Sequence, residues 1–244
     1  MLTLIVLPTY QEAANVATVL ERVRAVGPDF RVLVVDDGSP DGTADLAEAI
    51  GAELGGIDVL RRPRKAGLGS AYREGFRWGL ERGFEILVEM DADLSHDPAA
   101  LPTLVQAAAD GADLALGSRY VPGGGIPRWT WYRRTLSRWG NRYAAMALGF
   151  DVADATSGFR AYRADILRRV NLDSVRADGY GFQIEMVYRV ATTGGTVVEV
   201  PIQFADRTRG TSKMSGKIIV EAMTLVTWWG VRDRVKRWRR HRTN

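Results

Sequence analysis

Short apolar runs alternate along this chain with longer segments whose apolar residues recur at helical spacing, and this alternation permits very few folds. Four runs are predicted to be strands: Leu2–Leu7, Arg31–Val35, Ile57–Leu60 and Ile86–Glu89. The segments between them are predicted to be helices: Glu12–Val26, Thr43–Ile50 and Gly69–Glu81. Val197–Pro201 is a further short strand. The pattern predicts an α/β fold with a mostly parallel central sheet and helices on both faces.

Polar stretches follow the first, second and fourth of these strands. They are Pro8–Glu12, Asp36–Gly42 and Asp91–His96. Because the carboxyl ends of parallel strands meet at one edge, all three stretches are expected to open onto that edge, where such sheets bind ligands.

The acidic pair Asp91 and Asp93 is the strongest candidate for metal chemistry. Both residues lie just after a buried strand, where their carboxylates can turn toward a divalent cation that bridges two phosphates. The alternative is that they cap the helix that begins at Pro98, although Asp97 is itself a good N-cap. The chain has no cysteine, so oxygen or histidine ligands must hold any metal, which favours Mg²⁺ or Mn²⁺.

The Asp36–Asp37 pair lies in a Gly-rich turn that has two interpretations. Its carboxylates can accept hydrogen bonds from a ribose or a base, or they can simply stabilise the turn. A P-loop and a dinucleotide fingerprint are both missing, because Gly67-Leu68-Gly69 lacks the third glycine and no Gly-Lys-Ser/Thr triplet occurs. Lys65 is either a residue near the nucleotide or a surface lysine.

Composition indicates one domain with a C-terminal appendage. The 244 residues are 46% hydrophobic, which suffices for a full core. The net charge of +4 belongs to the end of the chain, where seven Arg and Lys residues follow Val231 against the single acid Asp233. No apolar stretch of about 18 residues predicts a membrane span, and the N-terminus does not resemble a signal peptide. The expected location is the cytoplasm.

The C-terminal segment is predicted to be an amphipathic helix for the membrane surface. Ile218–Trp229 has helical apolar spacing, and a basic cluster follows it, a pattern suited to anionic lipid. A disordered solubilising tail is the alternative. We therefore divide the chain into residues 1–216 as the catalytic domain and 217–244 as the basic tail.

Several ordered motifs together resemble one enzyme family. They are Asp36–Thr43, Met90–His96, Gly117–Tyr120 and Val200–Ile202, within a match that runs from about Leu4 to Trp229. The chain resembles the dolichol- or polyprenol-phosphate mannose synthases, which are GT-A glycosyltransferases, and is most similar to the bacterial type without C-terminal membrane helices.

The resemblance implies roles for individual residues. The residues that it implies for nucleotide-sugar binding are Pro8, Tyr10, Glu12, Val35, Asp37, Asp91, Ala92, Asp93, Arg207 and Lys213. The implied metal ligands are Asp91, Asp93 and Ser95, which stands where some relatives have Gln. Arg119, Arg133 and Ser137 are implied around the acceptor phosphate, and Asp93, Arg119 and Arg133 are implied as catalytic. The segments Asp154–Arg160 and Gly179–Glu185 are expected to shape the sugar pocket, with Glu185 as either a sugar contact or a helix-terminal charge.

The implied reaction is an inverting transfer of mannose from GDP-mannose to polyprenyl phosphate. A phosphate monoester is already ionised at neutral pH, so the reaction needs no strong general base, in keeping with a chain whose only histidines are His96 and His241. The protein is expected to bind peripherally to the cytoplasmic face of the membrane, where a membrane protein is a possible partner.

Three other functions compete with this interpretation. A polyprenyl-phosphate glucosyltransferase that uses UDP-glucose shares fold and acceptor. A sugar-nucleotide pyrophosphorylase would have a Gly-rich loop where Pro8–Glu12 stands. A nucleic-acid-binding module would leave the acidic loops unexplained, since carboxylates repel phosphate unless a metal intervenes, so no nucleic-acid partner is expected.

Overall fold

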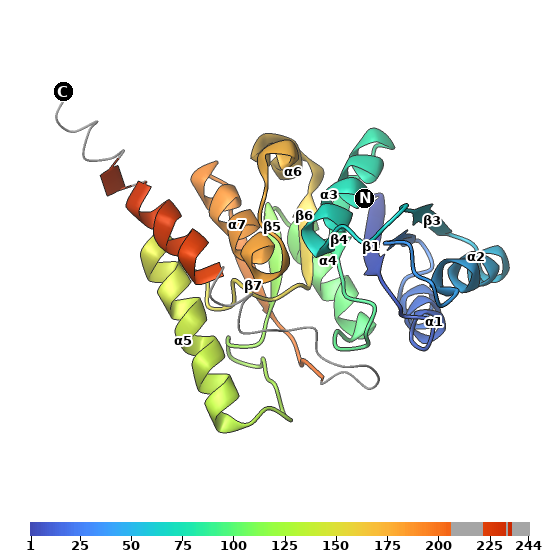
Figure 1. Cartoon of the computed structure of the whole chain (residues 1–244), viewed down its shortest axis with the longest axis horizontal. Coiled ribbons are helices and arrows are strands. Elements are labelled where there is room, and N and C mark those ends of the chain that lie inside the picture. Colours follow the sequence, from blue (N-terminus) through green and yellow to red (C-terminus); the bar gives the residue numbers. More distant parts are fainter. Residues whose placement is uncertain (206–221, 233, 236–244) are drawn as a thin grey trace.

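The computed structural model describes residues 1–205, 222–232 and 234–235. It is an α/β protein built on a seven-stranded sheet with the order β3-β2-β1-β4-β6-β5-β7 (Figure 1). The strands are β1 (Thr3–Thr9), β2 (Arg31–Asp36), β3 (Ile57–Arg61), β4 (Ile86–Glu89), β5 (Leu114–Ser118), β6 (Arg160–Arg163) and β7 (Val197–Pro201). Every pairing is parallel except those of β6, which runs antiparallel to both β4 and β5. The mostly parallel sheet is therefore confirmed.

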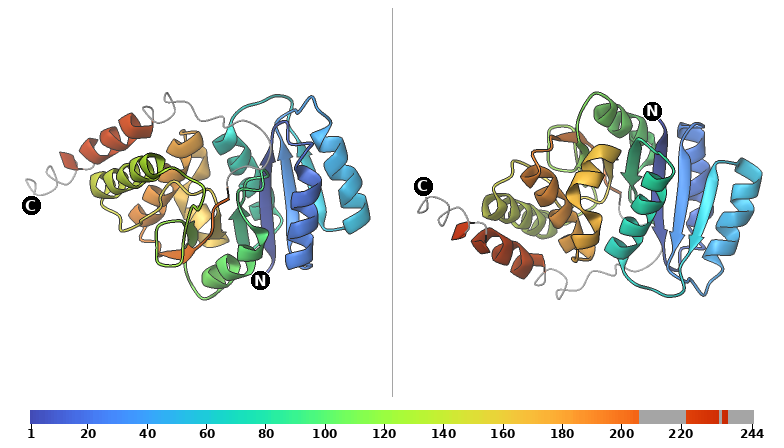
Figure 2. Two further views of the ribbon diagram at one scale, coloured as in Figure 1. Left: turned by 90° about the horizontal axis from the view of Figure 1, so that it is seen from below. Right: turned by 90° about the horizontal axis from the view of Figure 1, so that it is seen from above.

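Helices cover both faces of this sheet, as predicted (Figure 2). They are α1 (Val16–Val26), α2 (Thr43–Leu54), α3 (Leu68–Glu81), α4 (Leu101–Ala109), α5 (Trp131–Leu148), α6 (Ala164–Val170) and α7 (Gly179–Thr192), with short 3-10 turns η1 (Pro98–Ala100) and η2 (Leu172–Ser174). Residues 222–232 and 234–235 are also helical. No helix in the described part of the chain is long and apolar enough to span a membrane.

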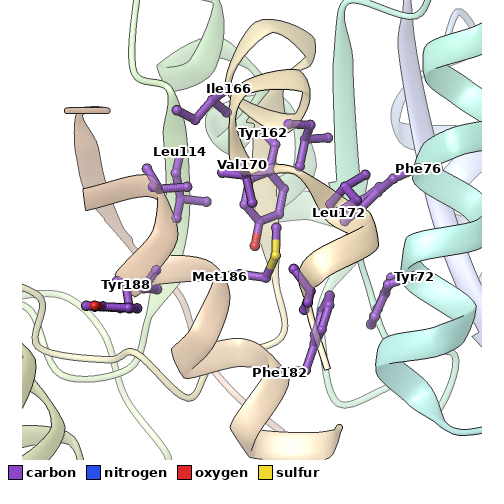
Figure 3. Close-up of a cluster of buried hydrophobic side chains, with 14 of the residues drawn as sticks. Tyr72, Phe76, Leu114, Tyr162, Ile166, Val170, Leu172, Phe182, Met186 and Tyr188 are labelled. Carbon is purple, nitrogen blue, oxygen red and sulfur yellow. The ribbon is translucent and has the colours of Figure 1, made fainter. Parts of the chain in front are cut away.

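Strand alternation divides the buried side chains into two cores. Ile5 and Leu7 of β1 point toward α1, α2 and α4, whereas Leu4 and Val6 point toward α3 and the later helices. The second core is rich in aromatic rings: Tyr72 stacks on Phe182 with a centroid separation of 5.9 Å, which joins α3 to α7 (Figure 3). This core holds the later half of the chain against the sheet.

Helix α1 begins at Val16 rather than at Glu12, where its apolar spacing starts. The backbone N–H groups of Gln11, Glu12 and Ala13 instead donate to the side chains of Ser39, Thr43 and Asp41, at 3.0, 3.0 and 3.2 Å, in the loop after β2 and at the first residue of α2. The polar stretches after β1 and β2 are thereby fastened to each other. Further along, Asp97 caps η1 by accepting from the Ala99 N–H at 3.0 Å, so Asp91 and Asp93 are not needed as caps.

Candidate active site

A cavity of about 720 Å³ opens at the sheet edge where β1, β2 and β4 end. All three polar stretches predicted to meet there contribute to its wall. Ten of the predicted site residues line it: Pro8, Tyr10, Glu12, Asp37, Asp91, Ala92, Asp93, Ser95, Arg119 and Arg133. Lys65 lines it too, with its Nζ 4.1 Å from the centre of the Tyr10 ring. The predicted site residues that line this one cavity therefore range in sequence from Pro8 to Arg133.

Two predicted residues, Val35 and Ser137, are described but do not line this wall, and two others lie outside the described residues. Val35 is fully buried in the core beneath α3, since the pleat of β2 turns its side chain away from the edge. Ser137 lies one helical turn beyond Arg133 on α5 but does not line the cavity. Arg207 and Lys213 lie outside the described residues.

The carboxylates of Asp36, the last residue of β2, and of Asp37, the next residue, have different surroundings. Asp36 stabilises the turn, because it accepts from the Ser39 N–H at 2.8 Å and from the Thr9 hydroxyl at 2.9 Å. Asp37 lines the cavity and accepts from the Arg62 guanidinium and from the N–H groups of Ala66 and Gly67. The turn-stabilising interpretation therefore fits Asp36, and Asp37 is the residue of the pair that lines the cavity.

The loop after β4 brings oxygen atoms together in a way that suits a hard cation. Asp91 and Asp93 both line the cavity, and Asp93 accepts from the Ser95 N–H at 3.0 Å. The Ser95 hydroxyl is buried and has no hydrogen-bond partner among the described residues. Among the residues that the structure describes, no group of three or more Asp, Glu, His or Cys side chains is arranged to hold a metal ion. A cation here would combine two carboxylates and a hydroxyl with oxygens from a ligand and water, which is ordinary for Mg²⁺ or Mn²⁺.

Neighbouring residues orient Asp91. The Tyr72 hydroxyl lies 3.3 Å from Asp91 Oδ1, and burial together with that carboxylate raises the pKa of Tyr72 well above its usual value. The phenol therefore stays protonated and donates. His96 Nδ1 accepts from the Asp91 N–H at 3.2 Å, and its ring stacks on Phe159. His96 is held as a structural part of the loop by these contacts.

Arg119 is fixed before any ligand arrives. Its Nε and Nη2 donate to the two oxygens of Asp154 at 2.7 and 2.6 Å, and Nη2 also donates to the Thr156 hydroxyl at 2.8 Å. Burial alone would lower the pKa of this guanidinium, but the Asp154 carboxylate outweighs burial and the pKa of Arg119 is raised. Arg119 thus stays charged, with a rigid bidentate anchor.

Arg133 reaches the cavity from the first turn of α5. Its guanidinium lies 4.0 Å from the ring centre of Trp129, a buried residue that also lines the cavity. This cation–π contact orients a long side chain that would otherwise sample many rotamers. The two predicted phosphate-binding arginines therefore enter the same cavity from different segments.

The later half of the chain also lines the cavity. Gly158 and Gln183 come from the two segments that the resemblance implied for the sugar pocket, whereas Asp178 was not singled out by the sequence. Asp178 caps α7 and also accepts from the Gly69 N–H at the start of α3, at 2.5 Å. Gly69 is required there, because a Cβ would lie 2.8 Å from the Ala177 carbonyl oxygen. Gln183 lines the cavity, and its buried side-chain amide interacts with the buried Glu89 carboxylate. A Cβ on Gly158 would lie 3.5 Å from Gln183 Nε2 and 3.6 Å from Asp91 Oδ2, so this glycine opens space between the two side chains.

Glu185 has a structural role. It is buried away from the cavity, pairs with Arg189 at 2.6 Å and accepts from the Ala177 N–H at 3.0 Å. Those contacts favour the helix-associated charge over the sugar contact. Glu185 therefore holds the loop before α7 in place through its hydrogen bond from the Ala177 N–H.

Comparisons with known proteins agree with this architecture. The family model described as glycosyl transferase family 2 matches residues 4–170. A polyprenol monophosphomannose synthase from Mycolicibacterium smegmatis is 49% identical over 96% of this chain and 89% of its own length. An undecaprenyl-phosphate mannosyltransferase from Micrococcus luteus is 50% identical over 96% of both chains.

Solved structures share the fold at low sequence identity. A glucosyl-3-phosphoglycerate synthase from Mycobacterium tuberculosis, in complex with Mn²⁺, UDP and glucosyl-3-phosphoglycerate, superposes with a TM-score of 0.69 at 21% identity, covering 92% of this chain and 78% of that one. A mannosyltransferase from Pyrobaculum calidifontis, in complex with GDP-Man and Mn²⁺, gives 0.61 at 16% identity over 93% and 69%. The GT-A fold expected from the sequence motifs is confirmed.

Proposed function

The chain belongs to glycosyl transferase family 2, and we propose that it transfers mannose from GDP-mannose to the phosphate of a polyprenyl phosphate, giving polyprenyl phosphate β-mannose. The acceptor class is supported by the names of the relatives that are about half identical over nearly the whole chain. The donor is supported by the GDP-Man in the Pyrobaculum calidifontis complex of the same fold.

The observation that carries this proposal is the composition of one cavity. Its wall contains the carboxylates of Asp91 and Asp93 together with the guanidinium groups of Arg119 and Arg133. A metal ion held by the two carboxylates is enough to bind a nucleotide diphosphate, so a protein that only binds a nucleotide does not need the two arginines as well. A transferase must hold both a departing diphosphate and an incoming phosphate.

We assign the divalent cation to Asp91 and Asp93, with the orphaned hydroxyl of Ser95 beside them. When bound, Mg²⁺ or Mn²⁺ would neutralise charge that develops on the diphosphate leaving group. Both solved complexes of this fold named above hold Mn²⁺ with their nucleotides, which supports a divalent ion here.

In the proposed reaction, a phosphate oxygen of the acceptor forms a bond to C1 of mannose. The bond between C1 and the diphosphate oxygen breaks, and its electron pair leaves with GDP, so the configuration at C1 inverts. The acceptor phosphate is ionised at neutral pH, so no side chain has to remove a proton. Arg119, rigid on Asp154, and Arg133, held against Trp129, position that phosphate.

The remaining roles concern binding of the GDP-mannose donor and of the membrane. Pro8, Tyr10, Glu12 and Asp37 form the wall beside which the guanosine would lie. Arg207 and Lys213, outside the described residues, are retained as a proposed clasp over the diphosphate. We also propose peripheral binding at the cytoplasmic face of the membrane, through the basic C-terminal segment and anionic lipid.

One assay with two donors tests this function. Radiolabelled GDP-mannose and UDP-glucose are supplied separately with a short polyprenyl phosphate and Mg²⁺ or Mn²⁺, and labelled lipid is extracted. We expect lipid labelling from GDP-mannose that chelation abolishes. Preferred labelling from UDP-glucose would replace the mannosyl assignment with glucosyl transfer, and no labelled lipid from either donor would overturn the proposed acceptor.

A further inference from the structure

The first half of α5 presents apolar side chains to solvent instead of to a core. None of residues 131–140 is buried, whereas Asn141, Ala144 and Leu148 in the second half pack against the body of the protein. Trp131 is 78% exposed and Trp139 is 57% exposed. A surface helix ordinarily turns its apolar side inward, so these side chains require an explanation outside the fold itself.

The apolar residues of α5 form one continuous line. They follow one another at spacings of four, three, four and three residues, which keeps them on one side of a helix with 3.6 residues per turn. This α5 stripe consists of Tyr132, Leu136, Trp139, Tyr143 and Met146. Tyr143 is partly buried and the other four are exposed. Asn141, Ala144 and Leu148 lie on the opposite side of the helix, so the four exposed members of the stripe point away from the body of the protein.

The charge around the α5 stripe has a single sign. Residues 114–150 contain no Asp or Glu but six arginines. Arg142 lies three residues after Trp139 and four before Met146, so it flanks the stripe, and Arg138 lies one turn before Arg142. Both arginines are exposed. Exposed aromatic rings flanked only by arginines match the interfacial region of an anionic bilayer, where rings lie at headgroup depth and guanidinium groups meet lipid phosphates.

A second helix with the same character lies beside α5. In Figures 1 and 2 the helix at residues 222–232 runs along α5, and the hydroxyls of Tyr143 and Thr227 are 2.7 Å apart. Val226 and Trp229 on its inner side are buried, while Trp228 and Val231 on its outer side are exposed. Two neighbouring helices therefore both expose apolar side chains.

We propose that the α5 stripe docks the protein onto the surface of an anionic membrane. This inference rests on the proposed function only in that the acceptor lipid would lie in the same membrane. The first turn of α5 carries Arg133, which lines the cavity, so docking by this helix would hold the cavity beside the lipid headgroups. The membrane contact is then a folded surface next to the active site and not the basic tail alone.

Vesicle binding by matched double variants of the full-length protein tests the docking surface. Leu136→Ser with Trp139→Ser removes two members of the stripe, while Leu46→Ser with Leu54→Ser removes two exposed leucines of α2. On vesicles that contain phosphatidylglycerol, we expect affinity to fall about tenfold or more in the α5 variant and to stay unchanged in the α2 variant. An α5 variant that folds, as judged by thermal unfolding, and binds like wild type would overturn the proposal.

A label on the stripe gives an answer that does not depend on the fold of the serine variant. The chain has no cysteine, so Leu136→Cys and Leu54→Cys each accept a single environment-sensitive fluorophore. On phosphatidylglycerol vesicles the emission should shift to the blue at position 136 and stay unchanged at position 54. No shift at position 136 when the protein is vesicle-bound would contradict the docking surface.

Two further measurements separate this inference from its rivals. Transfer to a water-soluble, short-chain polyprenyl phosphate should be equal in wild type and the α5 double variant, whereas transfer to a long-chain acceptor in vesicles should fall about tenfold. Failure of all transfer would reject the proposed function and leave the binding results standing. If sedimentation velocity shows a wild-type dimer that the α5 variant dissociates, a second copy covers the stripe and the membrane proposal is overturned.

Discussion

Arg133 and Arg134 are adjacent residues with separate surroundings. Arg133 lines the cavity over Trp129, whereas Arg134 is exposed and donates to the Trp129 carbonyl oxygen at 2.9 Å. We predict that Arg133→Gln raises the KM for a water-soluble acceptor roughly tenfold to a hundredfold, the value of a charge-assisted hydrogen bond, with little change in the KM for the donor. Arg134→Gln serves as the matched control. Equal effects of both substitutions on the acceptor KM would argue against acceptor binding by Arg133.

Gln183 lines the cavity, and its buried amide interacts with the buried Glu89 carboxylate and lowers the pKa of that group. We predict that Gln183→Met destabilises the free protein by about 1 kcal/mol, because it removes a hydrogen-bonding partner from a buried carboxyl group. The same change should reduce transfer about tenfold or more, since sugar hydroxyls lose a partner. Urea unfolding and steady-state kinetics measure the two effects. Loss of stability without loss of activity would show a purely structural glutamine.

The sequence identifies site residues where chemistry and chain position coincide. Asp91, Asp93 and Asp37 directly follow buried strands, and strand ends converge by construction in a parallel sheet. Asp178 carries no such signal, and Gln183 is indicated only by the resemblance of the segment Gly179–Glu185. Asp178 reaches the cavity beside Gly69, which lies 109 residues earlier and donates to it, and a contact of that sequence separation is not visible in local sequence pattern.

Strand β6 shows how elements build the wall of the site. Arg160 on β6 is fully buried and donates to the carbonyl oxygens of Ala155, Ser157 and Gln183, each at 2.7 Å. It therefore fastens the loop before β6 and the start of α7 to the sheet. The antiparallel placement of this strand between β4 and β5 was not predicted, because four residues beginning and ending in Arg do not show the apolar run of a central strand.

Glu89 on β4 lies opposite Arg160 in the sheet and has a pH-dependent effect on stability. Burial raises its pKa to about 7 from a usual value of 4.5, although the Arg160 charge opposes that rise. A raised pKa means that the folded state binds the proton more tightly, so the stability contributed by the protonated form is lost as pH rises from about 4.5 through 7. We predict that Glu89→Gln becomes more stable relative to wild type by up to about 3 kcal/mol between pH 5 and pH 8.

Urea unfolding at several pH values measures this difference. Glu21→Gln, on the exposed side of α1, is the control and should track wild type across the range. Parallel stability profiles for wild type and Glu89→Gln would show that Glu89 does not titrate between pH 5 and pH 8 in the folded protein.

At the scale of the whole molecule, the fold brings to one edge of the sheet cavity-lining residues that are far apart in the sequence. The first half supplies acidic loops after β1, β2 and β4, and the later segments supply Arg119, Arg133 and Gln183. The same α5 that carries Arg133 also exposes the α5 stripe. Site and proposed membrane contact are thus consequences of one arrangement of helices around a sheet.

The binding of Mn²⁺ in the presence of GDP, followed by electron paramagnetic resonance, tests the central claim that Asp91 and Asp93 hold a cation with the nucleotide in this cavity. Wild type should bind the ion, and Asp93→Asn should bind it at least about tenfold more weakly, since it loses one charged oxygen ligand. Asp97→Asn, which changes only the cap of η1, should bind like wild type. If Asp93→Asn binds Mn²⁺ and GDP as tightly as wild type, the cation is held elsewhere and the account fails.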